Sequence, residues 1–336
     1  MKNTMRVITF LLILAIVAGA LTGCFKKDDG KIKIGVSLPT LREERWVEDY
    51  NGFLDAQESL GFEVIIQVAD NSAARQQNQV ENMITQGIKA LVIAPHDAVA
   101  ARQLVQLAHK NKIPVIAYDR PITNGGADLL IETDQLEIGR IMGRYIFNNV
   151  PSGNLVFLMG DAGDDTVYPM RDGTMEIIKP RLDNGTYKIV MEQFVVDWVN
   201  ANALRLMEQA LTANGNNIQG VIAQNDGIAG AAIQAMAAQG LAGKVPVTGQ
   251  DAENDAIKRI IDGTQGMTIL YDNAGMAMAA VDAAIKLANG ASSASLSNGR
   301  SDDGTYVLGF PPAEINKNNY KRLLIDSGLR DEDDFH

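Results

Sequence analysis

The stretch from residue 89 to residue 120 reads KALVIAPHDAVAARQLVQLAHKNKIPVIAYDR, and it contains one complete strand–helix–strand unit. Residues 90–94 are apolar throughout, which is typical of a parallel strand covered on both faces. Residues 99–110 carry apolar side chains at three- and four-residue spacing, which predicts a helix. Residues 113–118 form the next apolar run, so the unit predicts two parallel strands joined by a helix.

The same alternation continues on both sides of this unit. The other elements expected in the first half are strands at 32–38, 62–69 and 129–132 and helices at 43–60 and 73–86. Those expected in the second half are strands at 154–159, 187–195, 220–224 and 245–249 and helices at 171–178, 202–213, 228–239 and 256–261. Two successive runs of strand–helix units predict an α/β fold with two doubly wound parallel-sheet lobes.

Composition limits the classes of function. The chain has 336 residues, 46% of them hydrophobic, and a formal net charge of −11. Such an acidic chain offers no basic surface to a nucleic acid backbone. Its three histidines (His96, His109 and His336) lack the spacing of metal ligands, and its single cysteine, Cys24, has no partner for a disulfide. We therefore expect no metal site, no cofactor and no nucleic acid partner.

The N-terminal residues have the pattern of an export signal. Lys2 and Arg6 precede an uncharged apolar run at 8–20, and Leu-Thr-Gly-Cys follows at 21–24. The run is too short for a stable membrane-spanning helix. The ending resembles the lipobox of bacterial lipoproteins, which implies a signal peptide at 1–23 and a lipid on Cys24 that holds the protein at a membrane outside the cytoplasm. The alternative is a plain signal peptide with a coincidental cysteine.

Two short polar segments flank the main body of the chain. Residues 24–30 are expected to be a flexible tether, whose two lysines either contact anionic headgroups or are simply solvated. Residues 330–336 are acidic and are expected to be a solvated tail.

Polar side chains follow the carboxyl ends of most expected strands, where ligands bind in open α/β sheets. The chain's two tryptophans, Trp46 and Trp198, belong to this set. Indole rings can cover the apolar faces of a pyranose, and Asp, Asn and Arg side chains can bracket its hydroxyls, so the set predicts a sugar site. The alternatives are helix caps for Asp226 and Asp251 and ordinary packing for the tryptophans. The set comprises Arg42, Glu43, Arg45, Trp46, Asp119, Arg120, Asp134, Asp161, Asp197, Trp198, Asn225, Asp226, Gln250 and Asp251.

Several short stretches together carry a family resemblance. They are LREERW (41–46), ENMI (81–84), AYDR (117–120), LMG (158–160), NAL (202–204), ND (225–226), GQDA (249–252) and INKNN (315–319). Over about residues 31–319 the chain resembles the type I periplasmic sugar-binding proteins of ABC importers, and within them the D-xylose-binding branch. The resemblance implies two lobes joined by three crossing segments, a sugar enclosed between them, and a monomer that delivers the sugar to a membrane permease.

The resemblance also implies which residues hold the sugar. Trp46 and Trp198 would stack on its two faces. The polar ligands would be Arg45, Asp119, Arg120, Asp134, Asp165, Asn225, Asp251 and Asp272. The N-terminal lobe would comprise 31–133 and 272–300, and the C-terminal lobe 134–271 and 301–336, with crossings near Asp134, 267–271 and 301–306.

Two places depart from the D-xylose-binding pattern. Asp272 stands where that branch has a lysine, and Asp164-Asp165-Thr166 stands for an asparagine pair in a loop one residue shorter. An anion in place of a cation at the cleft edge alters the preference for hydroxyls. The expected ligand is therefore a monosaccharide, with D-xylose first and glucose, arabinose or another aldose open. The calcium loop of related galactose-binding proteins has no counterpart here, since no D-x-[DN]-x-[DN] run occurs.

Two other functions fit parts of the pattern. An enzyme on the same architecture is disfavoured, because the chain lacks a G-x-S-x-G elbow, a phosphate loop and a dinucleotide fingerprint. Adjacent carboxylates such as Asp164 and Asp165 rarely converge on one glycosidic bond. A sensor that presents a sugar or a furanose signal to a receptor kinase stays open as the alternative to import.

Overall fold

The structure is a computed structural model that describes residues 31–335. The predicted signal peptide, Cys24 and the tether lie outside the described residues. The fold below is that of the structural unit that begins at Lys33. Between residues 31 and 335, no helix combines the length and the apolar character needed to cross a membrane.

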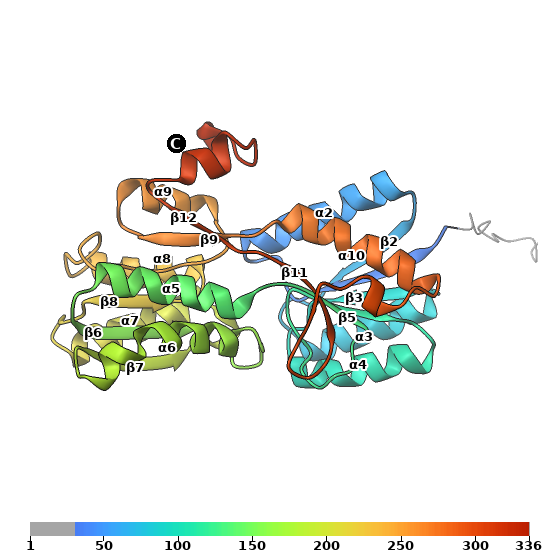
Figure 1. The fold of residues 1–336 in the computed structure, drawn as a ribbon, viewed down its shortest axis with the longest axis horizontal. Helices are drawn as coiled ribbons and strands as arrows, with labels where there is room; N and C mark the ends of the chain where they lie inside the picture. Colours follow the sequence, from blue (N-terminus) through green and yellow to red (C-terminus); the bar gives the residue numbers. More distant parts are fainter. Residues whose placement is uncertain (1–30, 336) are drawn as a thin grey trace, which may run out of the picture. The chain divides into compact units, whose positions relative to one another are not determined.

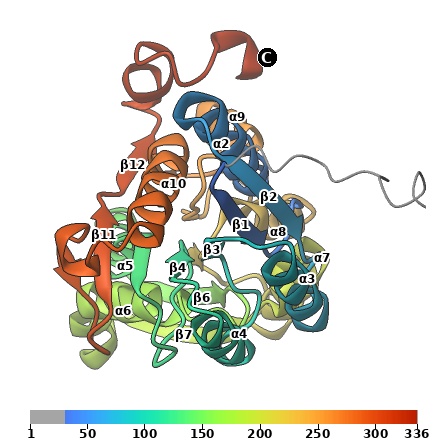
Figure 2. The same cartoon turned by 90° about the vertical axis from the view of Figure 1, so that its right-hand side faces the viewer.

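The first lobe is built on a seven-stranded sheet with the order β10-β11-β5-β4-β3-β1-β2, which is parallel except at the β10–β11 pair. Strand β3 (Ala90–Ile93) is buried throughout, as its uniform apolar sequence predicts. Helices α2 and α10 pack together on one face, and α3 and α4 lie on the other (Figures 1 and 2). The remaining elements are β1 (Lys33–Leu38), α2 (Glu44–Leu60), β2 (Glu63–Val68), α3 (Ala73–Thr85), α4 (Ala98–Lys110), β4 (Val115–Tyr118), β5 (Leu129–Thr133), α10 (Asn273–Ala288), β10 (Gly299–Arg300) and β11 (Tyr306–Phe310).

The second lobe contains a three-stranded parallel sheet, β7-β6-β8, that is also covered on both faces. Along β6 (Gly153–Met159), Phe157 packs in a cluster with Ile178 of α6, and the next residue, Leu158, packs in another with Met207 of α7. This alternation confirms the predicted α/β class. The other elements are α5 (Gln135–Asn149), α6 (Val167–Asp183), β7 (Tyr187–Phe194), α7 (Asn200–Ala213), β8 (Gly220–Ala223), α8 (Asp226–Ala237), α9 (Asn254–Asp262), β9 (Met267–Leu270), β12 (Ala313–Asn316), and short helical turns at Val196–Trp198, Ser293–Ser295, Lys321–Ile325 and Glu332–Phe335.

Helix α5 was not predicted, although it begins directly at the first crossing between the lobes. It packs closely against α6 at two glycines. A Cβ at Gly139 would lie 2.0 Å from the carbonyl oxygen of Met170, and one at Gly173 would lie 2.0 Å from that of Leu136. No side chain fits at either position, so the two backbones approach each other more closely than larger residues would allow.

The third crossing differs from the prediction. Strand β11 pairs in parallel with β5, so residues 299–310 belong to the first sheet rather than to the C-terminal lobe. The chain then crosses at 311–312, and β12 pairs with β9 in an antiparallel ribbon. The physical reason is that the β11 backbone completes the edge of β5, and its hairpin partner β10 covers the new edge in turn.

Two local predictions are wrong. The run at 245–249 forms only an isolated bridge between Val221 and Val247 rather than a strand. The acidic C-terminal segment is not simply solvated, because Phe335 is buried against helix α9 and Arg330 pairs with Glu48 of α2. The segment is acidic on average, but its Phe335 supplies apolar area that can be buried.

Candidate functional site

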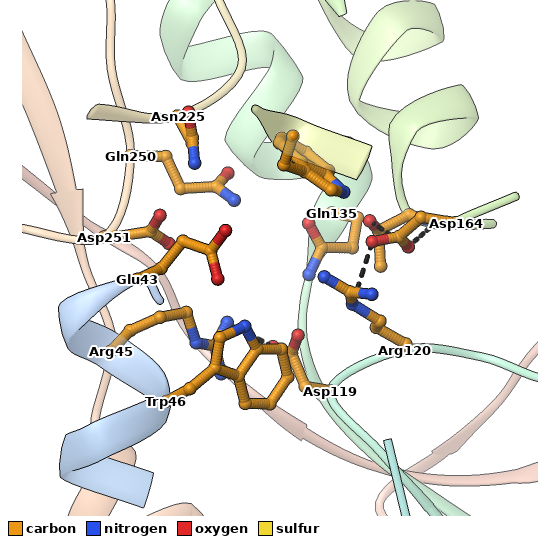
Figure 3. A pocket seen from close by; sticks show the side chains of 12 residues that line it. Glu43, Arg45, Trp46, Asp119, Arg120, Gln135, Asp164, Asn225, Gln250 and Asp251 are labelled. Atoms are coloured by element: carbon orange, nitrogen blue, oxygen red, sulfur yellow. Dashed lines mark hydrogen bonds and ion pairs between the residues drawn. The ribbon is translucent and has the colours of Figure 1, made fainter. Parts of the chain in front are cut away.

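A pocket lies between the two lobes, at the ends of strands β4, β6 and β8 (Figure 3). Its empty volume, including the part open to solvent, is about 360 Å³. Polar side chains dominate its wall, together with both tryptophans. The lining residues are Glu43, Arg45, Trp46, Asp119, Arg120, Gln135, Asp164, Thr166, Trp198, Asn225, Gln250 and Asp251.

Strand ends and helix starts position these groups. Asp119 follows β4 with a left-handed backbone (φ 62°), which turns the chain so that Asp119 and Arg120 both line the pocket. Asn225 follows β8 and caps α8 by accepting a hydrogen bond from the Ile228 amide at 2.8 Å. Asp251 also has a positive φ of 103°. The site therefore forms where the carboxyl ends of strands from the two lobes meet, as the rule for parallel sheets predicts.

Arg45 is held in one orientation by two carboxylates. Its Nη1 donates to Asp119 at 2.8 Å, and its Nη2 donates to Asp49 at 2.9 Å. The guanidinium carbon lies 4.3 Å from the ring centre of Trp46 and 4.9 Å from that of Tyr271. Charge-assisted hydrogen bonds and aromatic contacts thus fix this side chain without the help of a ligand.

A buried tyrosine completes the support behind Arg45. The hydroxyl of Tyr118, at the end of β4, donates to Asp49 at 2.6 Å. Burial raises the pKa of Asp49 to about 6, while the Arg45 charge and the Tyr118 hydrogen bond act in the opposite direction. The same burial raises the pKa of Tyr118 well above its ordinary value, so this tyrosine is a neutral donor at neutral pH.

Arg120 bonds across the pocket to the other lobe. Its Nε lies 2.8 Å from Oδ2 of Asp164, which is in the loop between β6 and α6. The other carboxylate oxygen of Asp164 accepts from the hydroxyl and the amide of Thr166, at 2.6 and 3.0 Å. Burial raises the pKa of Asp164 although the Arg120 charge opposes this shift. The pair therefore joins the two lobes inside the site.

The two tryptophans occupy different settings. Trp46 is 2% exposed, and its ring centre also lies 5.2 Å from the guanidinium carbon of Arg120. Trp198 is 9% exposed and belongs to the hydrophobic core of the second lobe, so its packing and its contact with the pocket coexist. Gly160 makes room for this ring, because a Cβ there would lie 2.0 Å from two of the ring carbons.

Four buried polar atoms on lining residues have no hydrogen-bond partner within residues 31–335. They are Glu43 Oε2, Gln135 Oε1, Trp198 Nε1 and Gln250 Oε1. Buried polar atoms are normally satisfied, so an unpartnered set that lines one pocket indicates a polar ligand. Asp251 lines the same pocket, and burial raises its pKa well above the usual range while the Arg45 charge opposes the shift.

The pocket brings together most of the predicted ligands. They are Arg45, Trp46, Asp119, Arg120, Trp198, Asn225 and Asp251.

Three predicted residues lie elsewhere. Asp134 caps α5 through the Glu137 amide, and Asp272 caps α10 through the Gly275 amide, each at 2.9 Å. Asp165 accepts from the Thr123 amide at 3.3 Å and lines a separate groove with Asp134. Capping geometry thus turns Asp134 and Asp272 toward backbone amides rather than toward the pocket, and Asp165 turns toward a backbone amide of the first lobe.

Five of the lining residues are absent from the predicted sugar ligands. Glu43 and Gln250 belong to the polar set at strand ends but not to the ligands that the family resemblance implies, and Asp164 departs from the family pattern. Gln135 opens the unpredicted helix α5, so its position had no signal. The five residues are Glu43, Gln135, Asp164, Thr166 and Gln250. Across residues 31–335, no group of three or more His, Cys, Asp or Glu side chains is arranged to hold a metal ion.

Comparisons with known proteins identify the family of the chain. A model of the periplasmic binding protein domain matches residues 34–292. A D-xylose-binding periplasmic protein of Escherichia coli (strain K12) is 40% identical over 305 residues, which cover 90% of this chain and 92% of the relative. A multiple sugar-binding periplasmic receptor of Rhizobium radiobacter is 30% identical, with 93% and 94% covered.

A solved structure shows the same fold. The solute-binding protein of a carbohydrate transporter from Chloroflexus aurantiacus, in complex with D-glucose, matches with a TM-score of 0.83 at 28% identity, over 90% of this chain and 98% of that one. The matched family and relatives consist of solute-binding proteins rather than enzymes. The chain therefore belongs to the periplasmic binding protein family, and its resemblance to the type I sugar-binding proteins of ABC transporters, nearest to the D-xylose-binding branch, is confirmed.

Proposed function

We propose that this protein encloses one monosaccharide, D-xylose before other aldoses, and delivers it to the permease of an ABC importer. The observation that carries the proposal is the set of unpartnered polar atoms that line the pocket from both lobes. Each buried atom of this kind costs about 1–3 kcal/mol when nothing satisfies it. Sugar hydroxyls both donate and accept, so one sugar can satisfy carboxylate, amide and indole groups together.

The lining of the pocket supports a sugar ligand. Ten polar side chains and two indole rings form its wall. The polar groups can bond to the hydroxyls at the edge of a sugar ring. The indole rings supply apolar area for the faces of the ring.

The choice of D-xylose rests on the relatives and on the position of Asp272. The relatives from Escherichia coli and Haemophilus influenzae are named as D-xylose-binding proteins, at 40% and 37% identity. The acidic Asp272 is a departure from that branch, but it caps a helix outside the pocket. The departure therefore gives no reason to prefer another aldose. One structural neighbour was solved in complex with D-glucose, so the binding experiments should include hexoses.

Hinge closure is the mechanism that the contacts favour. Three segments connect the lobes, and the pocket draws Arg45 and Trp46 from one lobe and Asn225 and Asp251 from the other. A ligand favours the closed state only through its different affinity for the two states, and contacts with both lobes provide that difference. We infer that the closed form is the one that the permease recognises.

The location follows from the N-terminal sequence. We propose that the chain is exported and held at the membrane by a lipid on Cys24. In cells fed a labelled fatty acid, the wild type should carry label and sediment with membranes. The Cys24→Ser variant should carry none, and the proposal of a lipid anchor fails if this variant is labelled equally.

Calorimetric titration with a panel of aldoses tests the ligand. We expect D-xylose to bind with a dissociation constant near micromolar, about −8 kcal/mol, and more tightly than D-ribose, L-arabinose or D-glucose. Gln250→Ala removes an unpartnered pocket acceptor and should weaken binding about tenfold. Its matched control is Gln234→Ala, on an exposed part of α8. Equal affinities of the two variants, or no response to any sugar, would refute the proposal.

A further inference from the structure

The loop that joins β6 to α6 bonds to the first lobe at three consecutive residues. The Gly163 carbonyl accepts from the Ala98 amide at 3.0 Å, and the Asp165 carboxylate accepts from the Thr123 amide at 3.3 Å. Between them, Asp164 pairs with Arg120 at 2.8 Å. We call residues 163–165 the bridging loop. Its central contact differs from the other two because it is an ion pair that lines the sugar pocket.

Arg120 belongs to the first lobe, but that lobe alone does not fix its guanidinium. Within the first lobe its Nη1 donates to the Pro95 carbonyl at 3.3 Å, which is a long hydrogen bond. The Trp46 ring, also of the first lobe, lies 5.2 Å from its guanidinium carbon. The ion pair of Arg120 is with Asp164 of the other lobe, where Nε lies 2.8 Å from Oδ2. Arg45, in contrast, is fixed by Asp49 and Asp119 of its own lobe.

Asp164 is itself held rigidly. Its side chain is 2% exposed, and Oδ1 accepts two bonds from Thr166, so only Oδ2 faces Arg120. A carboxylate fixed in this way restricts where the guanidinium that it pairs with can lie. When the lobes separate, the bridging loop leaves Arg120, and this constraint is lost.

We propose that Asp164 is a positioning residue for Arg120 that acts across the cleft, so that the Arg120 donor reaches its sugar hydroxyl in the correct orientation only after closure. This inference rests on the proposed sugar-binding function and goes beyond it. Discrimination at one particular hydroxyl is assigned to the closing step rather than to the first encounter. The weak contacts of the open state are less selective, because a misaligned donor penalises a missing hydroxyl less.

The test compares D-xylose with its monodeoxy analogues by calorimetry. In the wild type, one analogue lacks the hydroxyl bound by Arg120 and should bind about 10- to 100-fold more weakly than D-xylose. Asp164→Ala should weaken D-xylose about tenfold and should abolish most of the penalty for that analogue alone. Asp164→Asn retains an oxygen acceptor for Arg120 Nε and should restore part of the discrimination.

A matched control separates positioning from simple adhesion of the lobes. Glu44 of the first lobe accepts from the amide and the side chain of Asn254 of the second, at 2.8 and 2.7 Å, outside the pocket. Glu44→Ala should weaken D-xylose and every analogue by one common factor. If Asp164→Ala also weakens all of them by a common factor, Asp164 only holds the lobes together and the inference is overturned.

A double-mutant cycle gives an independent reading. Because Asp164 is inferred to act through Arg120, the Arg120→Ala/Asp164→Ala variant should bind D-xylose no more weakly than Arg120→Ala alone. Additive losses would contradict the inference. Melting temperatures without sugar check that each variant is folded, and Asp164→Asn carries the comparison if Asp164→Ala does not fold. If the wild type binds none of the sugars, the proposed function fails and this inference fails with it.

Discussion

Gly160→Ala probes the pocket without altering any group that would bond to a sugar. The added Cβ would lie 2.0 Å from Cη2 and Cζ2 of Trp198, against 3.4 Å or more for an ordinary contact. The indole would have to move by roughly 1.4 Å to restore normal packing. It has little freedom to do so, because it packs in the core of the second lobe and Asp161 fixes the adjacent Asp197 amide at 2.6 Å.

The expected loss follows from these contacts. Overpacking of this kind costs typically 1–3 kcal/mol, and a displaced ring no longer covers the face of the sugar. We expect sugar affinity to fall about 10- to 100-fold, at 1.4 kcal/mol for each factor of ten. The melting temperature without sugar should also fall, since Trp198 is both core and pocket wall.

Calorimetry and thermal unfolding measure the two effects separately. The control is Gly299→Ala, where the added Cβ meets no heavy atom within 4 Å and the backbone is not left-handed. That variant should keep the wild-type affinity and stability. A folded Gly160→Ala protein that binds sugar within twofold of the wild type would refute the placement of Trp198 against the ligand.

Three further variants test the groups around the site. Burial raises the pKa of Asp49 to about 6, so Arg45 loses a charged partner as the pH drops through about 6. Calorimetry should then show that the wild type binds sugar more weakly at lower pH. The Asp49→Asn variant should bind more weakly already at neutral pH and should lack this pH dependence. Burial raises the pKa of Glu132 to about 8, so between about pH 5 and 8 the folded state keeps a proton on Glu132 that the unfolded state loses. The free energy of unfolding should therefore fall as the pH rises through this range. Urea titrations of Glu132→Gln should show a smaller fall. Phe335→Ala should lower the free energy of unfolding by about 3 kcal/mol because it opens the packing against α9, and calorimetry should find sugar affinity unchanged.

The sequence predicted the part of the fold that depends on local pattern. Uniform apolar runs such as 90–94 are buried strands, because both faces of a parallel sheet are covered. Helix α5 escaped prediction because Gly139 and Gly143 interrupt its apolar pattern, and both serve the close approach to α6. The position of β11 depends on pairing with a strand 177 residues earlier in the chain, as the pair Val307 and Leu130 shows, and no local pattern carries that information.

The site shows the same limit at the level of single side chains. Polar residues after strand ends predicted Asp119, Arg120 and Asn225 in the pocket, because strand geometry alone places them there. Asp134 and Asp272 also follow strand ends, but each caps the next helix. Both roles use the same residue type at the same place, so only the direction of the side chain separates a ligand from a cap.

The two arginines suggest an order for binding. Arg45 is fixed within the first lobe by Asp49 and Asp119, so this half of the site is formed whether or not the lobes meet. Arg120 forms its ion pair with Asp164 of the second lobe. A sugar that first contacts the preformed half would lose little entropy in ordering protein side chains. Closure would then satisfy Gln250 and Trp198 and align Arg120 in the same step. Selectivity and closure would thereby depend on one another, since a sugar that left these groups unpaired would also stabilise the closed form less.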